Sequence, residues 1–172
     1  ALGLGSDAEG AVLTVDGKNY SYSELPLTFW WDSGSLHSYT YQQYISSKNP
    51  GKRYANHDPP GGLMEVLGSN NLSASYHIEY KLVISVSPFE DCSTNPSPGS
   101  YWYDSGSTVQ VSALSNASCN FDYWILDESN VGSSNPLTII MNSSHTLTAV
   151  YKNKVSRILE LISSVVSTII VN

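Results

Sequence analysis

The sequence predicts an all-β protein of two small tandem β-sandwich-like modules, followed by an apolar C-terminal tail. An internal repeat is the first observation behind this prediction: FWWDSGS at residues 29–35 returns as YWYDSGS at residues 101–107. The second is a series of short alternating segments separated by Gly, Pro, Ser and Asn, a pattern typical of strands in sandwiches and barrels. No segment before the tail has helical periodicity. These features favour the same β module built twice.

The repeat divides the chain into an N-terminal extension (1–10), β module 1 (11–81), β module 2 (82–152) and a C-terminal segment (153–172). Each module closes with an alternating segment that ends in Tyr-Lys, LSASYHIEYK in the first and SHTLTAVYK in the second. Further strands are expected at VLTV, LPLTFWW, SLHSYTYQQYI, KRYANH and LMEVL in module 1, and at LVISVS, TVQVSA, NFDYWIL and PLTIIM in module 2.

The repeated string is expected to form a short strand and a tight hairpin turn. Gly34 and Gly106 would supply the positive φ that such a turn needs. Asp32 and Asp104 would cap the turn by accepting hydrogen bonds from backbone N–H groups two residues on. The aromatic residues before them would alternate between core and surface. A twofold ligand site would explain the aromatic residues but not the glycines, so the structural interpretation is favoured.

The composition favours a secreted or cell-surface protein. Charged residues make up 13% of the chain, about half the usual share. The net charge is −7 with eight Lys and Arg, so no basic patch for nucleic acid or an anionic membrane can form. The first residues, ALGLGSDAEG, resemble a mature N-terminus left by cleavage.

Two cysteines and four sequons agree with this location. Cys92 and Cys119 lack the spacing of a zinc site and are expected to form a disulfide, with two free buried thiols as the alternative. Closing a loop of about 28 residues would stabilise the fold by about 3–4 kcal/mol. The candidate glycosylation sites are Asn19, Asn71, Asn116 and Asn142.

No constellation for catalysis, cofactor binding or metal binding is recognisable in the sequence, so no enzyme, cofactor or metal site is expected. The acidic pairs 90–91 and 127–128 lie beside turns and are expected to be solvated. Asp127 and Glu128, with Asn130, would be at most a weak Ca²⁺ site, because no EF-hand loop is present. The four histidines lack metal-pair spacing and no His-x-His lies on a strand: His37, His57, His77 and His145.

The aromatic residues allow two interpretations. They could form a sugar-stacking platform, or they could be the large core residues that small modules need. The core interpretation is favoured. The residues concerned are Trp30, Trp31, Tyr101, Trp102, Tyr103, Tyr123 and Trp124.

The tail carries an apolar stripe that two complete modules have no evident place to bury. Its 3-4-3-4 spacing matches a coiled-coil seam, whereas its β-branched second half would suit a strand donated to a neighbour's sheet. The apolar run is too short and too often interrupted to span a bilayer. The stripe indicates a partner subunit and consists of Val155, Ile158, Ile162, Val165 and Ile169.

Module 2 resembles the divergent InlB-type B-repeat in GSYWYDSGSTVQVSA, NFDYWILDE and NPLTIIMNSSHTLTAVYK. Module 1 looks like a variant common in secreted and surface-layer proteins of thermophilic archaea, although Trp124 has no clear counterpart there. The resemblance implies a small extracellular β module without catalytic residues, used in tandem as stalk and adhesion units. The residues that carry it are Tyr101, Gly106, Val109, Phe121, Trp124, Thr146, Ala149 and Tyr151.

These observations predict a structural subunit of an extracellular assembly, a pilus-like filament or a surface-layer stalk, whose terminal segment joins it to copies of itself. A glycan-binding adhesion module is the alternative. An accessory domain pair of a secreted protease is a third possibility. The expected partners are therefore copies of the chain itself and, if the chain is an adhesion module, glycans.

Overall fold

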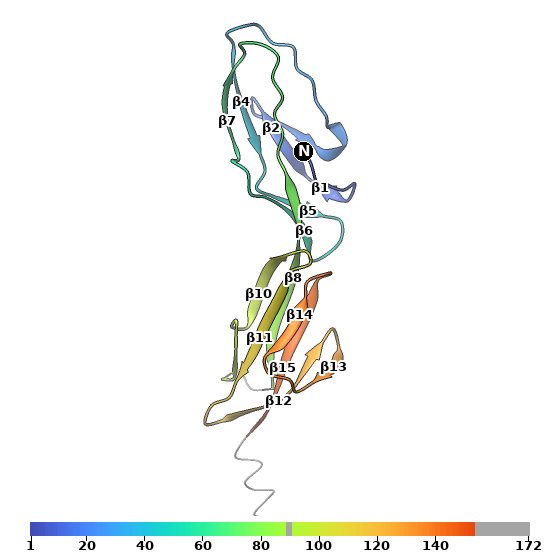
Figure 1. Ribbon diagram of the computed structural model, residues 1–172, viewed down its shortest axis with the longest axis vertical. Helices are drawn as coiled ribbons and strands as arrows, with labels where there is room; N and C mark the ends of the chain where they lie inside the picture. Colours follow the sequence, from blue (N-terminus) through green and yellow to red (C-terminus); the bar gives the residue numbers. More distant parts are fainter. Residues whose placement is uncertain (89–90, 154–172) are drawn as a thin grey trace, which may run out of the picture. The chain divides into compact units, whose positions relative to one another are not determined.

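The computed structural model describes residues 1–88 and 91–153 and is all-β over these ranges, as predicted (Figure 1). The only helical element described is a 3₁₀ turn, Tyr22–Glu24. The chain clusters into two compact units. Unit 1 comprises Ala1–Tyr80, Trp102–Ser105 and Asn142–Ser144; unit 2 comprises Lys81–Tyr101, Gly106–Met141 and, among the described residues that follow, 145–153.

The strands in chain order are β1 (Ala8–Glu9), β2 (Ala11–Val15), β3 (Lys18–Ser21), β4 (Leu36–Tyr41), β5 (Tyr44–Ser47), β6 (Lys52–Asn56), β7 (Gly61–Glu65), β8 (Tyr76–Ser87), β9 (Ser93–Asn95), β10 (Gly99–Asp104), β11 (Thr108–Leu114), β12 (Cys119–Leu126), β13 (Ser129–Gly132), β14 (Leu137–Ile140) and β15 (His145–Asn153).

Unit 1 has two sets of paired strands. One is the antiparallel sheet β3-β2-β4-β7. In the other, β5 pairs with β1 and β6, and β6 pairs with the first half of β8, through Tyr76–Tyr80. Strands of both sets contribute buried side chains to one cluster. The buried cluster comprises Val12, Leu13, Val15, Tyr20, Tyr41, Ile45, Tyr54, Ala74 and Tyr76.

The core of unit 1 is rich in tyrosine, and the hydroxyls of Tyr41 and Tyr76 are hydrogen-bonded to backbone carbonyls. Tyr41 donates to the carbonyl of Leu72 (3.1 Å), and Tyr76 donates to that of Gln42 (2.7 Å). Burial raises the pKa of Tyr76 to about 12, with a smaller contribution from Tyr41. Each hydroxyl therefore ties a connecting segment to the core, because a buried polar atom requires a partner.

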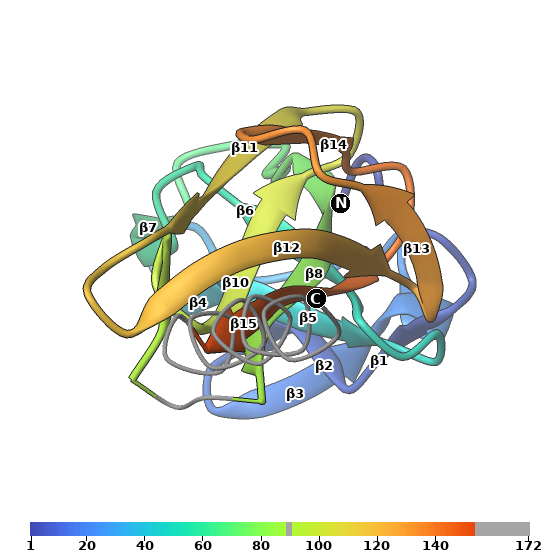
Figure 2. The same cartoon turned by 90° about the horizontal axis from the view of Figure 1, so that it is seen from below.

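Unit 2 is a two-layer β module. One layer is the antiparallel sheet β14-β11-β9; in the other, β15 pairs with β12 and, in parallel, with the second half of β8, and β13 extends it beyond β12. Figure 2 shows β11 and β14 on one side of this unit and β12 and β15 on the other. Buried between them are Leu82, Ile84, Val109, Val111, Ala113, Trp124, Ile139, Met141, Leu147, Ala149 and Tyr151.

The two turns of the repeated string have the same backbone bonds. Gly34 (φ 83°) donates to the carbonyl of Val66 (2.8 Å), and Gly106 (φ 82°) donates to that of Met141 (2.9 Å). The return bonds run from Val66 to Ser35 and from Met141 to Ser107, each 2.9 Å. The predicted positive φ is confirmed at both glycines. The same corner therefore occurs in both copies.

The expected hairpin is wrong in unit 2. β10, which precedes the turn, pairs with β8, whereas β11, which follows it, pairs with β14 and β9. The turn therefore joins strands of different sheets. The Asp104 carboxylate lies 3.1 Å from Nε2 of His77. Capping of the turns by Asp32 and Asp104 stays a prediction.

In unit 1 the expected strand at LPLTFWW is not formed, because residues 25–35 are held by stacked rings instead of a ladder. Tyr20 contacts Phe29 edge-on (5.8 Å between centroids), Phe29 stacks on Trp31 (4.7 Å), and Trp31 stacks on His37 (3.8 Å). The predicted alternation holds, since Phe29 and Trp31 pack on the core while Trp30 is 93% exposed.

Candidate functional site

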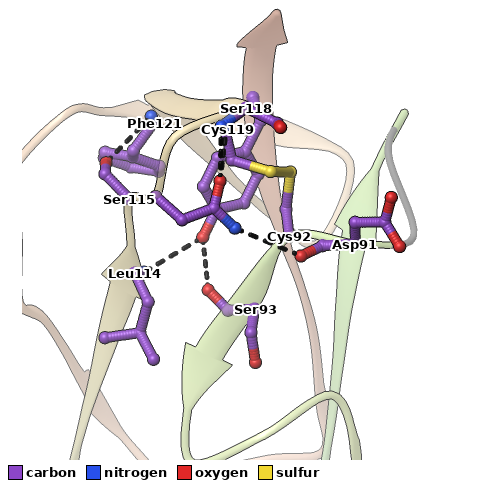
Figure 3. The surroundings of a disulfide bond; sticks show 10 residues. Asp91, Cys92, Ser93, Leu114, Ser115, Ser118, Cys119 and Phe121 are labelled. Atoms are coloured by element: carbon purple, nitrogen blue, oxygen red, sulfur yellow. Dashed lines mark hydrogen bonds between the residues drawn. A yellow bond between two sulfur atoms is a disulfide. The ribbon is translucent and has the colours of Figure 1, made fainter.

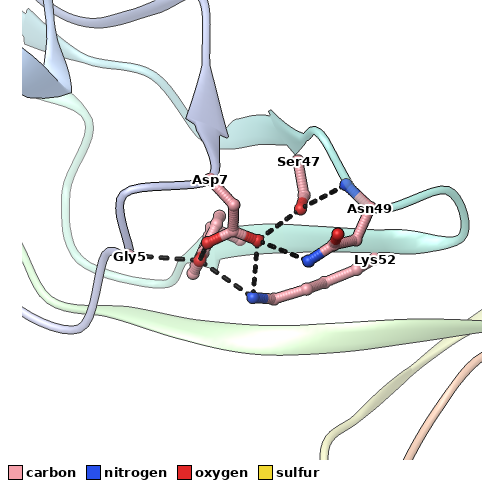
Figure 4. A network of polar contacts seen from close by, with 6 residues as sticks. Gly5, Asp7, Ser47, Asn49 and Lys52 are labelled. Atoms are coloured by element: carbon pink, nitrogen blue, oxygen red, sulfur yellow. Dashed lines mark hydrogen bonds and ion pairs between the residues drawn. The ribbon is translucent and has the colours of Figure 1, made fainter.

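The N-terminal segment is held to unit 1 by a polar network around Asp7 (Figure 4). The Asp7 carboxylate accepts hydrogen bonds from Lys52 Nζ (2.8 Å), Ser47 Oγ (2.6 Å), Asn49 Nδ2 (3.1 Å) and the Tyr54 hydroxyl. The amide of Gly5 donates to the same hydroxyl (3.1 Å). Residues 1–10, set apart as an extension in the sequence analysis, are thus integrated into unit 1.

These donors stabilise the ionised carboxylate. The hydrogen bond from Lys52, with those from Ser47 and Tyr54, holds the pKa of Asp7 well below its usual range. Burial lowers the pKa of Lys52, but its bonds to Asp7 and Tyr54 outweigh this and leave that pKa raised. Both groups therefore stay charged near neutral pH, and the network functions as an anchor for the segment.

A second attachment lies next to this anchor. Leu2 exchanges backbone hydrogen bonds with Ala74 and Tyr76 (2.8 and 2.9 Å). Gly3 has φ 79°, and a Cβ built on it would lie 2.0 Å from the carbonyl oxygen of Tyr76. Only glycine fits this approach, because both the backbone angle and the space exclude a side chain.

Unit 2 is closed by the disulfide Cys92–Cys119, the predicted pairing (Figure 3). Its Cα atoms are 5.8 Å apart, and it links the chain just before β9 to the first residue of β12. Beside it the Tyr151 hydroxyl donates to the carbonyl of Ser93 (2.5 Å) and accepts from the amide of Leu114 (3.1 Å). The bond and the phenol together tie β9 to β11, β12 and β15.

All four sequon asparagines are exposed. Asn116 is also part of the turn beside the disulfide, since its side-chain oxygen accepts from the amides of Ser118 (2.8 Å) and Cys119 (2.7 Å). Asn19 accepts from Thr14 Oγ1 (2.7 Å) on the neighbouring strand. Exposure permits glycosylation at each position, which remains a prediction.

An aspartate–histidine corner occurs in each unit. Asp16 contacts His37 Nδ1 (2.6 Å) and accepts from the amide of Ser38 (2.8 Å). In unit 2, Asp127 has the corresponding contact to His145 (2.6 Å) and the corresponding bond from Thr146 (2.8 Å). The expectation that the acids at 127–128 are merely solvated is therefore wrong for Asp127.

The pKa values of both corner aspartates are lowered. For Asp16 the bond to His37 is the main cause, followed by the amide of Ser38. For Asp127, burial raises the pKa, but the Thr146 amide and His145 together outweigh this effect. Neither acid is poised for proton transfer near neutral pH.

The aromatic residues divide between core and surface. Trp124 is fully buried and donates from Nε1 to the carbonyl of Ser134 (2.9 Å). Trp31 packs on the core of unit 1, and Trp30 is exposed. The core interpretation is confirmed for Trp124 and wrong for Trp30. Partly buried are Tyr101, Trp102, Tyr103 and Tyr123.

The structure also brings together two histidines that the sequence analysis left scattered. The rings of His57 and His77 have centroids 4.0 Å apart. His-x-Glu at residues 77–79 of an expected strand was a usable signal, because alternate residues share one face. Glu90 and the tail stripe of Val155, Ile158, Ile162, Val165 and Ile169 lie outside the described residues.

Residues 83–155 match the family model described as the Divergent InlB B-repeat domain. The match covers less than half of the chain and supports a B-repeat-like β module in its second half. No curated protein and no solved structure matches the chain. Within residues 1–88 and 91–153, no helix has the length and hydropathy needed to cross a membrane.

The geometry and this match define the class of protein. It is an all-β protein of two units, one stabilised by the Asp7 network and the other by the Cys92–Cys119 disulfide. The B-repeat-like module and the disulfide together indicate an extracellular or cell-surface protein.

Proposed function

We propose that this chain is a structural subunit of an extracellular assembly, a pilus-like filament or a surface-layer stalk, and that it acts without catalysis. The observation that carries the proposal is the apolar stripe in the sequence of residues 155–169. Such a stripe needs a hydrophobic partner surface. The second half's similarity to a B-repeat and its disulfide support an extracellular role.

The other candidate for the linking segment is the N-terminal EGAVLTV. Its residues 11–15 form β2, which is already paired on both sides, with β3 and with β4. Val12 in this strand is fully buried. A strand in this position has no unpaired edge to offer a neighbouring subunit, which favours the tail as the link.

Deletion of residues 154–172 tests the proposal. We expect loss of assembly in light scattering and electron microscopy while both units remain folded by NMR. Ile162→Asp should reproduce this loss, because it places a charge in the stripe, and the neighbouring Ser163→Asp is the matched control. Normal assembly of the truncated protein would overturn the assignment of the tail.

The alternative function, glycan binding, is favoured by one observation, the 93% exposed ring of Trp30. An exposed indole flanked by inward-facing Phe29 and Trp31 could stack on a sugar ring. A glycan array compared between the parent protein and Trp30→Ala tests this function. Binding that disappears with Trp30 would favour the adhesion module over the purely structural subunit.

A further inference from the structure

Three side chains of unit 1 converge in an arrangement suited to a metal ion. They are His57, directly after β6, and His77 and Glu79 on β8. One ligand atom from each lies within 4.8 Å of the others. In a tetrahedral zinc site with ligand distances of about 2.0–2.2 Å, ligand atoms lie roughly 3.3–3.5 Å apart. A contraction of up to about 1.5 Å would therefore complete the geometry.

The register of β6 and β8 explains this convergence. His77 and Glu79 are two residues apart on β8, so they project from the same face. Ala55 lies opposite His77 and Arg53 opposite Glu79, which places His57 diagonally across from His77. Ala55, which lies opposite His77, is fully buried and has a small side chain. His57 is exposed and lies outside the strand, so its side chain can supply the required movement.

The Nε2 atom of His77 is a buried polar atom without a hydrogen bond among the described residues. The nearest acid is Asp104, whose Oδ1 is 3.1 Å away but outside hydrogen-bonding geometry. A buried polar nitrogen without a partner is costly, and an ion bound by this nitrogen would remove the cost. Asp104 belongs to the stretch that clusters with unit 1 and would become an additional oxygen ligand after a movement toward His57 and Glu79.

Arg53 holds the third ligand in place. The Glu79 side chain is 12% exposed, and its Oε2 accepts a hydrogen bond from Arg53 Nε (2.5 Å). The guanidinium of Arg53 lies over the rings of Tyr44 (3.9 Å) and Trp102 (4.4 Å). This leaves Oε1 of Glu79 for an ion, with an orienting contact from outside the ligand set, as is usual in built metal sites.

We propose that His57, His77 and Glu79, with Asp104 as the fourth ligand, bind a divalent first-row transition metal ion of the Zn²⁺ type. Two imidazole nitrogens and two carboxylate oxygens suit Zn²⁺, whereas Ca²⁺ and Mg²⁺ prefer oxygen ligands alone. The ion would join the end of β6, the beginning of β8 and the end of β10. Its role would be to stabilise unit 1.

A simpler arrangement uses the same residues. The contact between His77 and Asp104 (3.1 Å) could exist without a metal ion and leave His57 unengaged. The two arrangements differ in His57, which is a ligand in the metal site and plays no part in the contact with Asp104. His57→Ala is also the variant that should fold normally, because the side chain is exposed.

The test is a Zn²⁺ titration of the full chain after treatment with EDTA, followed by calorimetry. We expect one Zn²⁺ per chain and a rise in the unfolding temperature. His57→Ala and Glu79→Gln should each weaken binding at least tenfold, while His37→Ala, the matched control on the other sheet of unit 1, should leave it unchanged. Unchanged Zn²⁺ affinity in His57→Ala would overturn the proposal.

Histidine NMR signals provide a readout that does not depend on folding of the variants. The chain has four histidines. Zn²⁺ at one equivalent should shift the ring signals of His57 and His77 and leave those of His37 and His145 in place. Equal shifts at all four, or none at millimolar Zn²⁺, would mean adventitious binding only and would refute the site.

Discussion

Four tyrosines lie in the core of unit 1, whereas the core of unit 2 is mostly aliphatic and holds a fully buried tryptophan and one tyrosine, Tyr151. The hydroxyls of Tyr41, Tyr54 and Tyr76 each bond to a segment outside their own strand. In unit 2 the connecting segments are held by the Cys92–Cys119 disulfide and by the hydroxyl of one tyrosine, Tyr151. Two modules with the same repeated corner thus secure their connecting segments by different chemistry.

This difference has a practical consequence for stability. A small β module buries little surface and needs additional constraints. Unit 1 obtains them from a charged network around Asp7, which depends on ionisation. Unit 2 obtains them from a covalent bond, which depends on redox state. We therefore expect acid to act first on unit 1 and reductant to act first on unit 2.

Removal of the disulfide should have the largest effect. The double variant Cys92→Ser/Cys119→Ser should lower the free energy of unfolding of unit 2 by about 3–4 kcal/mol, because the bond closes a loop of about 28 residues. Urea unfolding followed by the fluorescence of the chain measures the total loss. Amide exchange locates it, with faster exchange expected at Val111 and Leu147.

The amides of Val12 and Tyr54 in unit 1 are the internal control for this variant. Their exchange should remain at the parent rate if the two units are constrained separately. Equal acceleration in both units would show that they unfold as one cooperative body, and the comparison between them would then fail.

The Asp7 network should give the second largest effect. Asp7→Asn should destabilise unit 1 by about 1.5–3 kcal/mol, because it removes charge-assisted hydrogen bonds and leaves Lys52 without its carboxylate. The folded pKa of Asp7 is lowered relative to about 3.9 in the unfolded chain. Its contribution is therefore fully present above about pH 5 and lost as the pH falls below about 4.

Thermal unfolding of the parent protein and Asp7→Asn between neutral and acid pH measures this effect. The difference between them should shrink as the solution is acidified. Asp122→Asn is the matched control, because Asp122 pairs with a largely exposed Lys152 on unit 2 and such pairs contribute less than about 1 kcal/mol. A constant difference across the pH range would contradict the role of ionised Asp7.

The sequence predicted the backbone conformation of turn residues and the pairing of the two cysteines. It did not predict which residues of different strands lie opposite one another. The positive φ of Gly34 and Gly106 and the bond between Cys92 and Cys119 follow from residue type and compartment. The contact of His57 with His77 follows only from the register of β6 against β8, which no local pattern specifies.

The segment around Phe29 also shows which features the sequence could and could not predict. The alternation of Phe29, Trp30 and Trp31 predicted correctly which rings face the core. It did not predict that stacking with Tyr20 and His37 would replace strand pairing, because those partners come from other elements. Alternation predicts which side chains face the core. Whether the segment forms a strand depends on the residues of other elements that those side chains contact.

The smallest expected effect concerns the aspartate–histidine corner, which contains Asp16 in unit 1 and Asp127 in unit 2. In unit 1 the turn between β2 and β3 is Asp16–Gly17, and in unit 2 the turn between β12 and β13 is Asp127–Glu128. Gly17 has φ 81° and Glu128 has φ 67°, so unit 2 holds a side chain where unit 1 has none. A left-handed conformation costs a non-glycine residue roughly 1–2 kcal/mol. Glu128→Gly should recover part of this, partly offset by the entropy of glycine, for a net gain of about 0.5 kcal/mol.

Reciprocal substitutions in one urea-unfolding series test this estimate. Glu128→Gly should stabilise, Glu128→Ala should be close to neutral because it keeps the strained backbone, and Gly17→Ala should destabilise by about 1 kcal/mol. The Asp127–His145 contact should persist in both Glu128 variants, which the ring signals of His145 report. Destabilisation by Glu128→Gly would mean that the carboxylate of Glu128 contributes more than its backbone strain costs, and the two corners would then differ in chemistry as well as in sequence.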